Sequence, residues 1–271
     1  MLRIKPIRFH CGLQKPVRIL HLTDVHITLA DEQDSDAEKQ FAERRTEVFQ
    51  DASSVPETPS QLLEEAMEYA KQFDCTVITG DVIDNFCHAN LEETRRILSG
   101  KDYMFALGNH EYIQVSRLPS RTHESLEAKA ECMDVLRTVF PGDLTFDSRI
   151  VGGVNVITAD NALLAWSGEQ YDRFRQEAAK GYPMLIFTHV PLILPEGQRI
   201  DQLEGHMLRY GYTQEDIALT REVNDYLIDE PLVKGFIAGH CHMNADCEYR
   251  GKPCYLIGGL FDAIAAEIVI D

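Results

Sequence analysis

Apolar and polar positions along this chain follow two different periods, which predicts a fold that mixes strands and helices. Short apolar runs, typical of buried strands, occupy residues 17–22, 75–79, 103–107, 154–159, 184–188 and 236–238. Between these runs, apolar residues recur with the spacing of amphipathic helices over residues 91–99, 122–140, 168–180 and 213–228. Strands therefore alternate with helices over most of the sequence.

One helix has a well-defined start. Thr58 can cap it, Pro59 suits its first position, and Gln61 can complete a capping box. Apolar residues then recur on one face of this helix: Leu62, Ala66, Tyr69, Ala70 and Phe73. The charged segment 34–47 just before it predicts a solvated helix face or a mobile loop, and its place in the chain also allows it to form one wall of a cleft.

The end of the chain has a different pattern. From Asp246 onward it predicts antiparallel strands, with a turn near Gly251 and Lys252. Strand–helix alternation followed by a strand-rich tail indicates an α/β fold, a layered sandwich with helices on the outer faces. Because no repeat, low-complexity tract or flexible linker interrupts the sequence, we expect residues 1–271 to form a single domain.

Polar residues of the kinds that bind metal ions follow five of the predicted strands directly. The five strings are Asp24-Val25-His26, Gly80-Asp81-Val82-Ile83-Asp84, Gly108-Asn109-His110-Glu111, His189-Val190-Pro191 and His240-Cys241-His242. Each string alone is common in turns. Ligands of α/β proteins bind beyond the carboxyl ends of the strands, so five such strings together predict one convergent cluster.

The chemistry of these side chains points to metal ions. Imidazole, carboxylate and amide oxygen together suit divalent Mn, Fe, Co, Ni or Zn. A carboxylate shared by two cations about 3.5–4 Å apart screens their mutual repulsion, and coordination lowers the pKa of bound water toward about 7. The hydroxide so formed is a strong nucleophile. The donor types therefore predict a site for divalent metal ions that can activate water for hydrolysis.

The five strings, in this order, resemble the motifs of the calcineurin-like metallophosphoesterases: DxH, GDxxD, GNH(D/E), a later His, and GHxH. The match spans residues 24–242. The resemblance implies a four-layer αββα sandwich of two mixed sheets, with a dinuclear metal site at the carboxyl ends of the strands. It also implies two metal sites that share one bridging aspartate. The first would be held by Asp24, His26, Asp81 and His242, and the second by Asp81, Asn109, His189 and His240.

The resemblance also assigns two residues that bind no metal. His110 would lie near the leaving group, as a general acid or a hydrogen-bond donor to the phosphate, and Asp84 would pair with it. A helix N-cap is an alternative role for Asp84 that does not exclude this pairing. His21, inside the first predicted strand, is expected to be a core histidine or a neighbour of the ligands.

Two long segments are expected to form the substrate pocket. Residues 112–127 carry Arg117, Arg121 and His123, and residues 192–212 carry Arg199, Arg209, Tyr210 and Tyr212. Loops on a rigid scaffold often determine specificity, and an arginine can bind a phosphate with two hydrogen bonds. An ordinary surface position is the alternative for every one of these arginines.

Charge and cysteine content limit the partners and the compartment. Lys and Arg number 26 against 44 Asp and Glu, a formal net charge of −18, which repels long nucleic acids and anionic membranes. A small phosphate ester is still compatible, because bound cations can invert the local field. Seven cysteines, without a signal-like apolar segment at the start, suit a cytoplasmic protein with reduced thiols.

Departures from the family pattern narrow the substrate. Protein serine/threonine phosphatases have arginines where this chain has Asn85 and Leu107, so a phosphoprotein substrate is not expected. Purple acid phosphatases have a tyrosine ligand at the position of Asp84. A small phosphomonoester or phosphodiester, such as a nucleotide, fits best. A non-catalytic protein-binding scaffold of the same fold and a nuclease are the alternatives, and the sequence leaves the oligomeric state open.

Overall fold

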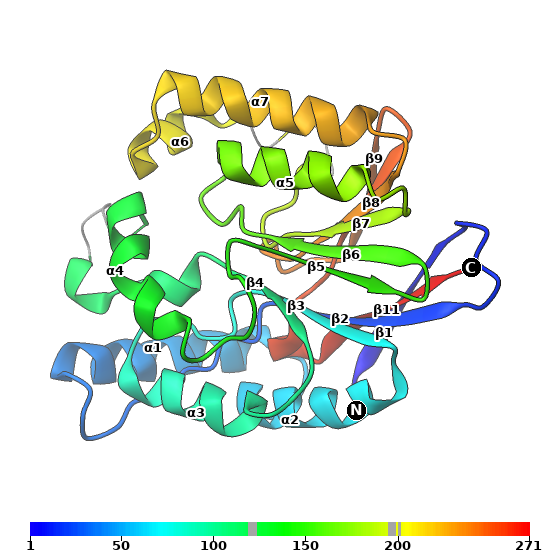
Figure 1. Ribbon diagram of the computed structural model, residues 1–271. Helices are drawn as coiled ribbons and strands as arrows, with labels where there is room; N and C mark the ends of the chain where they lie inside the picture. Colours follow the sequence, from blue (N-terminus) through cyan, green and yellow to red (C-terminus); the bar gives the residue numbers. More distant parts are fainter. Residues whose placement is uncertain (119–123, 195–198, 200–201) are drawn as a thin grey trace.

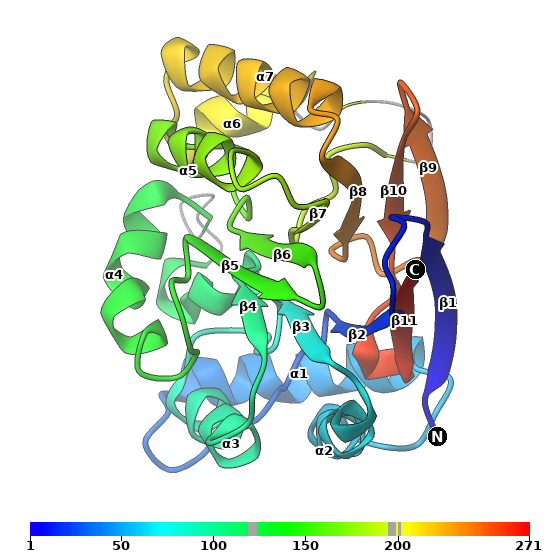
Figure 2. The same cartoon turned by 45° about the vertical axis from the view of Figure 1, so that its right-hand side comes forward.

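The computed structural model describes residues 1–118, 124–194, 199 and 202–271. Two mixed sheets pack face to face, and helices cover their outer faces, as Figures 1 and 2 show from two directions. The four-layer sandwich expected from the family resemblance is confirmed. Arg121 and His123, which the sequence placed in a substrate loop, lie outside the described residues.

The first sheet has the strand order β1-β11-β2-β3-β4. Its strands are β1 (Arg3–Phe9), β2 (Val17–Leu22), β3 (Cys75–Thr79), β4 (Met104–Ala106) and β11 (Ile264–Ile270). The strands β2, β3 and β4 run parallel to one another, whereas β11 is antiparallel to β2 and parallel to β1. The three parallel strands therefore end at the same edge of the sheet.

The second sheet has the order β5-β6-β7-β8-β10-β9. Its strands are β5 (Phe146–Val151), β6 (Val154–Ala159), β7 (Met184–Phe187), β8 (Val233–Ala238), β9 (Ala245–Tyr249) and β10 (Lys252–Leu256). The strands β6, β7, β8 and β10 are parallel, and β5 and β9 close the two edges in antiparallel pairs.

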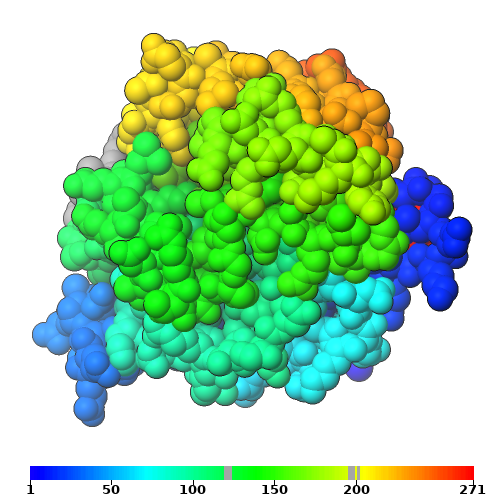
Figure 3. All heavy atoms as spheres, viewed as in Figure 1, coloured from blue at the N-terminus to red at the C-terminus, as the bar shows by residue number. Residues whose placement is uncertain are grey.

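Helices on each side cover one sheet. In Figures 1 and 2 the helices α1 (Asp36–Ala52), α2 (Pro59–Tyr69) and α3 (His88–Leu98) lie along the first sheet, and α5 (Gly168–Ala178) and α7 (Gln214–Asp229) along the second. The helices α4 (Leu126–Leu136) and α6 (Glu204–Tyr210) lie toward one end of the sandwich. In the space-filling view the segment leading into α1 and the β1–β2 connection project from opposite sides of the molecule (Figure 3).

Most elements agree with the sequence pattern. The helix α2 begins as expected, because Thr58 and Gln61 form a reciprocal capping box and Pro59 takes the first position. The charged segment before it forms the helix α1. The last strand corrects our expectation of a continuous antiparallel tail, since β11 leaves β9 and β10 and joins the other sheet.

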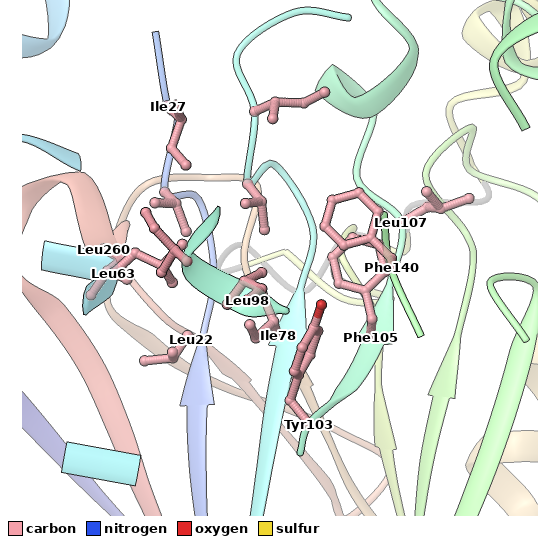
Figure 4. Packing of buried hydrophobic residues seen from close by; sticks show 14 of the residues in the cluster. Leu22, Ile27, Leu63, Ile78, Leu98, Tyr103, Phe105, Leu107, Phe140 and Leu260 are labelled. Atoms are coloured by element: carbon pink, nitrogen blue, oxygen red, sulfur yellow. The ribbon is translucent and has the colours of Figure 1, made fainter. Parts of the chain in front are cut away.

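Apolar residues fill three spaces between the layers. Strands β2 and β3 are buried on both faces, so their sequences are rich in apolar residues. Leu22, Ile78 and Phe105 point from neighbouring strands toward the helices in Figure 4, where Phe105 stacks on Phe140 with ring centroids 3.9 Å apart. A second cluster fills the space between the two sheets, and a third lies between the second sheet and α5 and α7. The sheets thus form a rigid support for the loops at their ends.

Candidate active site

The loops that follow β2, β3 and β4 meet the loops that follow β7 and β8. Backbone hydrogen bonds join the loops within each set: the Asp24 amide donates to the Gly80 carbonyl at 3.1 Å, and the Gly239 amide donates to the His189 carbonyl at 3.0 Å. Between the two sets, the His240 amide donates to the Asp24 carboxylate at 3.0 Å. All the metal-ligand candidates from the sequence gather where these loops meet: Asp24, His26, Asp81, Asn109, His189, His240 and His242.

One group of donor atoms lies on the β2 side of this cluster. The Nε2 atoms of His26 and His242 are 3.0 Å apart. The His242 Nε2 atom lies 3.3 Å from an Asp24 carboxylate oxygen, and the His26 Nε2 atom lies 3.8 Å from an oxygen of Asp81. Within this group of four, the donor atoms are all within 4.8 Å of one another.

A second group shares Asp81 with the first. The His189 Nε2 atom lies 3.2 Å from an Asp81 carboxylate oxygen and 3.1 Å from the Asn109 amide oxygen. The His240 Nδ1 atom is 3.1 Å from the same Asn109 oxygen and 3.2 Å from His189 Nε2. Asp81 therefore stands between two sets of donors.

This arrangement fits a pair of metal ions. Ring nitrogens that face each other at 3.0–3.2 Å would oppose lone pair to lone pair unless a proton or a cation lay between them. Buried carboxylates are costly unless they are paired or bind a cation, and Asp24 and Asp81 are almost fully buried. Imidazole with carboxylate and amide oxygen is a donor set for first-row divalent metals.

The backbone of the site is strained. Five of the seven candidate ligands have left-handed φ angles between 50° and 67°: Asp24, His26, Asp81, His240 and His242. Such conformations cost about 1–3 kcal/mol each for residues other than glycine and tend to cluster at functional sites. The fold therefore spends stability to aim these side chains at one point.

Two glycines let the loops after β3 and β4 touch. A Cβ atom at Gly80 would lie 2.1 Å from the Gly108 nitrogen, and one at Gly108 would lie 2.2 Å from an Asp81 carboxylate oxygen. Any side chain at either position would separate Asp81 from Asn109. Steric crowding thus explains why glycine occupies positions 80 and 108.

Glu111 is a site residue that the sequence analysis did not single out. Its buried carboxylate accepts backbone N–H bonds from Asp81, Val82 and Gly108 at 2.7–2.8 Å, and so ties the two ligand loops together. Burial and the charge of Asp81 raise the pKa of Glu111 to about 7. The place of Glu111 in the GNHE string was the only signal in the sequence.

We expect Glu111→Ala to lower the free energy of unfolding by about 3 kcal/mol or more, since each buried N–H left without a partner costs about 1–3 kcal/mol. Urea unfolding followed by circular dichroism would measure the change. Glu127→Ala is a matched control, because the Glu127 side chain is 75% exposed. Equal stabilities of the two variants would contradict this role.

His110 and Asp84 lie next to the cluster and contact each other. The His110 Nδ1 atom is 2.8 Å from the Asp84 carbonyl oxygen and 3.1 Å from its carboxylate. Burial alone would lower the pKa of His110. The charge of Asp81 and the hydrogen bonds to Asp84 outweigh burial and raise this pKa to about 10. The helix-cap alternative for Asp84 is wrong, because Cys87 is the N-cap residue of α3.

Further contacts from outside the five strings reach the cluster. Arg45 of α1 contacts the Asp84 carboxylate through two hydrogen bonds, and the Phe49 ring stacks on His26 at 4.6 Å. The segment that we expected to be solvated or mobile therefore forms a wall of the site, as its position allowed. The Asn109 Nδ2 atom donates to Glu124 at 3.1 Å, which turns the Asn109 oxygen toward the histidines.

The remaining candidates from the sequence have partners outside the two donor groups. Arg117 and Arg199 form ion pairs with Glu131 and Asp225, and Arg209 contacts a backbone carbonyl of its own helix. Tyr210 donates a 3.4 Å hydrogen bond to Glu124, and Tyr212 packs against apolar residues. His21 is buried and bonds the Thr79 hydroxyl at 2.7 Å, which confirms it as a core histidine.

A family model described as calcineurin-like phosphoesterase matches residues 17–244. This chain belongs to the calcineurin-like phosphoesterase family. As a member of it, the protein is a dinuclear metal-dependent hydrolase of phosphate esters. A search of curated protein sequences finds no match.

Solved structures of the family's fold resemble this phosphoesterase. A dimetal phosphatase from Danio rerio is 16% identical, covers 93% of this chain and 92% of its own, and has a TM-score of 0.51. A putative 5′-nucleotidase from Staphylococcus aureus, in complex with alpha-ketoglutarate, is 15% identical with a TM-score of 0.50. The match covers 94% of this chain and 51% of that protein, so this phosphoesterase spans about half of its length. At these identities the likeness shows the fold.

Among the described residues, no helix of the phosphoesterase combines the length and the apolar character that crossing a bilayer requires.

Proposed function

We propose that this phosphoesterase hydrolyses a small phosphomonoester or phosphodiester, with a nucleotide among the candidates, within one domain of residues 1–271. The observation that carries the proposal is the pair of donor groups that share Asp81. In the proposed assignment Asp24, His26, Asp81 and His242 hold one divalent ion, and Asp81, Asn109, His189 and His240 hold the other.

The side chains would divide the work as follows. Two bound divalent ions would supply positive charge that polarises the phosphoryl group and activates water near neutral pH. Asp81 places its carboxylate between both donor groups, and the Asn109 oxygen is held toward His189 and His240 by Glu124. His110 carries a proton on the rim of this cluster, where it can reach the leaving oxygen.

The net charge of the chain supports a small substrate. The chain has a net charge of −18, which disfavours long polyanions, and the cations would make the site itself attractive to a single phosphate. The complete ligand set disfavours a non-catalytic scaffold, since a bound cation accounts for ring nitrogens that lie 3.0–3.2 Å apart beside two buried carboxylates. The cysteine content, seven residues without a CxxC pair, favours a reducing compartment such as the cytoplasm.

A substrate panel with each metal supplied separately tests this proposal. Purified protein would be stripped with a chelator, reloaded with Mn²⁺, Fe²⁺, Co²⁺, Ni²⁺ or Zn²⁺, and assayed on p-nitrophenyl phosphate, bis-p-nitrophenyl phosphate, nucleotides and DNA. Turnover of a small ester, dependent on metal, supports the proposal and separates monoester from diester. Turnover of DNA alone supports a nuclease, and metal binding without any turnover supports a scaffold.

Metal binding should depend on pH in a defined direction. Burial alone would lower the pKa of His189, but the charge of Asp81 outweighs burial and raises this pKa to about 9. Burial lowers the pKa of His240 to about 4. A metal ion must therefore displace a proton from His189 at neutral pH, and affinity should rise with pH by up to about tenfold per unit below about pH 9. Calorimetry in buffers of different ionisation enthalpy would count the released protons, and binding independent of pH would contradict this expectation.

A further inference from the structure

Arg45 reaches the site from outside the five metal-ligand strings. It lies on α1, and its Nε and Nη2 atoms donate to the two carboxylate oxygens of Asp84 at 2.6 and 2.7 Å. The contact joins residues 39 positions apart in the chain. A planar guanidinium with two parallel bonds to a carboxylate is the geometry that fixes the carboxylate plane most firmly.

The helix holds the guanidinium in place. Phe41, Arg45 and Phe49 follow one another at four-residue spacing, so they share one face of α1. The Arg45 guanidinium carbon lies 4.8 Å from the centre of the Phe49 ring and 6.0 Å from that of Phe41. Phe49 is buried and also stacks on His26, so the same face of α1 contacts both Asp84 and a candidate ligand.

The carboxylate that Arg45 binds also contacts two histidines. Its Oδ1 atom lies 3.0 Å from Nδ1 of His26 and 3.1 Å from Nδ1 of His110. When His26 donates its Nδ1 proton to Asp84, the Nε2 lone pair is left facing His242 and Asp81, which is the tautomer that a metal ligand needs. The carboxylate is fully buried, and its direction is fixed by its bonds to Arg45, His26 and His110.

We propose that Arg45 is a positioning residue: by fixing the Asp84 carboxylate it sets the tautomer of His26 and the direction of His110 together. This inference rests on the proposed function. The hydrogen bonds of Arg45 from Nε and Nη2 go to Asp84, so its effect on the donor groups passes through that carboxylate. Side chains that do not bind the metal but orient its ligands typically contribute about 10–100-fold to metal affinity.

Calorimetric titration of Mn²⁺ and Zn²⁺ into metal-free protein tests the inference without an activity readout. We expect Arg45→Met to weaken the binding of one of the two ions by about 10–100-fold, and Arg45→Lys to give an intermediate loss, because lysine keeps the charge but not the two-pronged geometry. Arg44→Met is the matched control: Arg44 is the neighbouring, exposed residue of α1, and its Nε atom donates to the Gln40 carbonyl of the same helix. It should bind both ions within about twofold of the wild type.

Kinetics with a substrate found in the panel separate positioning from substrate binding. Arg45→Met should lower kcat and leave KM nearly unchanged, and added guanidinium should restore part of the activity of Arg45→Ala. A higher KM with unchanged kcat would mean that Arg45 binds the phosphate, and would overturn the inference. If Arg45→Met does not fold, as judged by circular dichroism, Arg45→Lys decides alone: wild-type metal affinity in it overturns the inference.

The outcomes distinguish this inference from the proposed function. Wild-type metal affinity in Arg45→Met, in a protein whose wild type binds two ions and hydrolyses esters, overturns the role of Arg45 and leaves the function standing. A wild type that binds no divalent ion overturns both.

Discussion

Asp81→Asn should lower kcat/KM by roughly 10³-fold or more and leave the protein unable to hold two metal ions. Asparagine has nearly the same shape as aspartate but carries no charge. It cannot screen two cations from each other, and its single carbonyl oxygen cannot serve both donor groups. Metal ions contribute several kcal/mol to the stabilisation of charge in the transition state, and every 1.36 kcal/mol or so corresponds to a factor of ten in rate.

Elemental analysis after gel filtration, together with steady-state kinetics, would check this prediction. Asp102→Asn provides the control, since the Asp102 side chain is 83% exposed and pairs with Arg149 on the surface. The control should keep two ions and full turnover. Two ions and near-normal turnover in Asp81→Asn would show that this residue does not bridge the donor groups.

His110→Ala should lower kcat by about 10²–10⁴-fold while the metal content stays unchanged. The residue lies beside the donor groups without belonging to the two sets that share Asp81, and its ring is held by Asp84. A general acid matters most when the leaving oxygen is basic. The loss should therefore be largest for alkyl phosphates and smallest for p-nitrophenyl phosphate, whose leaving group needs little protonation.

A series of aryl and alkyl esters would measure that dependence. His206→Ala serves as the control, because His206 is an exposed residue of α6. If the loss were the same for every leaving group, His110 would act as a hydrogen-bond donor to the phosphate instead. Unchanged activity would remove it from the reaction.

The sequence predicted those parts of the fold that have strong local patterns. The central strands β2 and β3 are buried on both faces, so their apolar runs could be read directly. The strands β1 and β5 were missed for the opposite reason. Both lie at the edges of their sheets, half exposed, with charged residues and, in β1, a proline whose missing N–H is tolerated only there.

The candidate site shows the same division. The motif residues could be found because each follows a strand, and parallel strands deliver their ends to one edge. Arg45, Phe49 and Glu124 could not be found that way, because their contacts depend on how a helix and a loop pack across the ends of the strands. The spacing of residues along the chain does not indicate how that helix and that loop are oriented. The helical repeat of Phe41, Arg45 and Phe49 marks a face, but not what the face covers.

The candidate ligands come from both halves of the sandwich. Asp24, Asp81 and Asn109 follow strands of the first sheet, whereas His189, His240 and His242 follow strands of the second. A pair of cations bound by all of them would link the loops of the first sheet to those of the second. A chain whose halves have not yet docked would offer each ion only part of its ligands, so hydrolysis would require both halves to be folded and packed together.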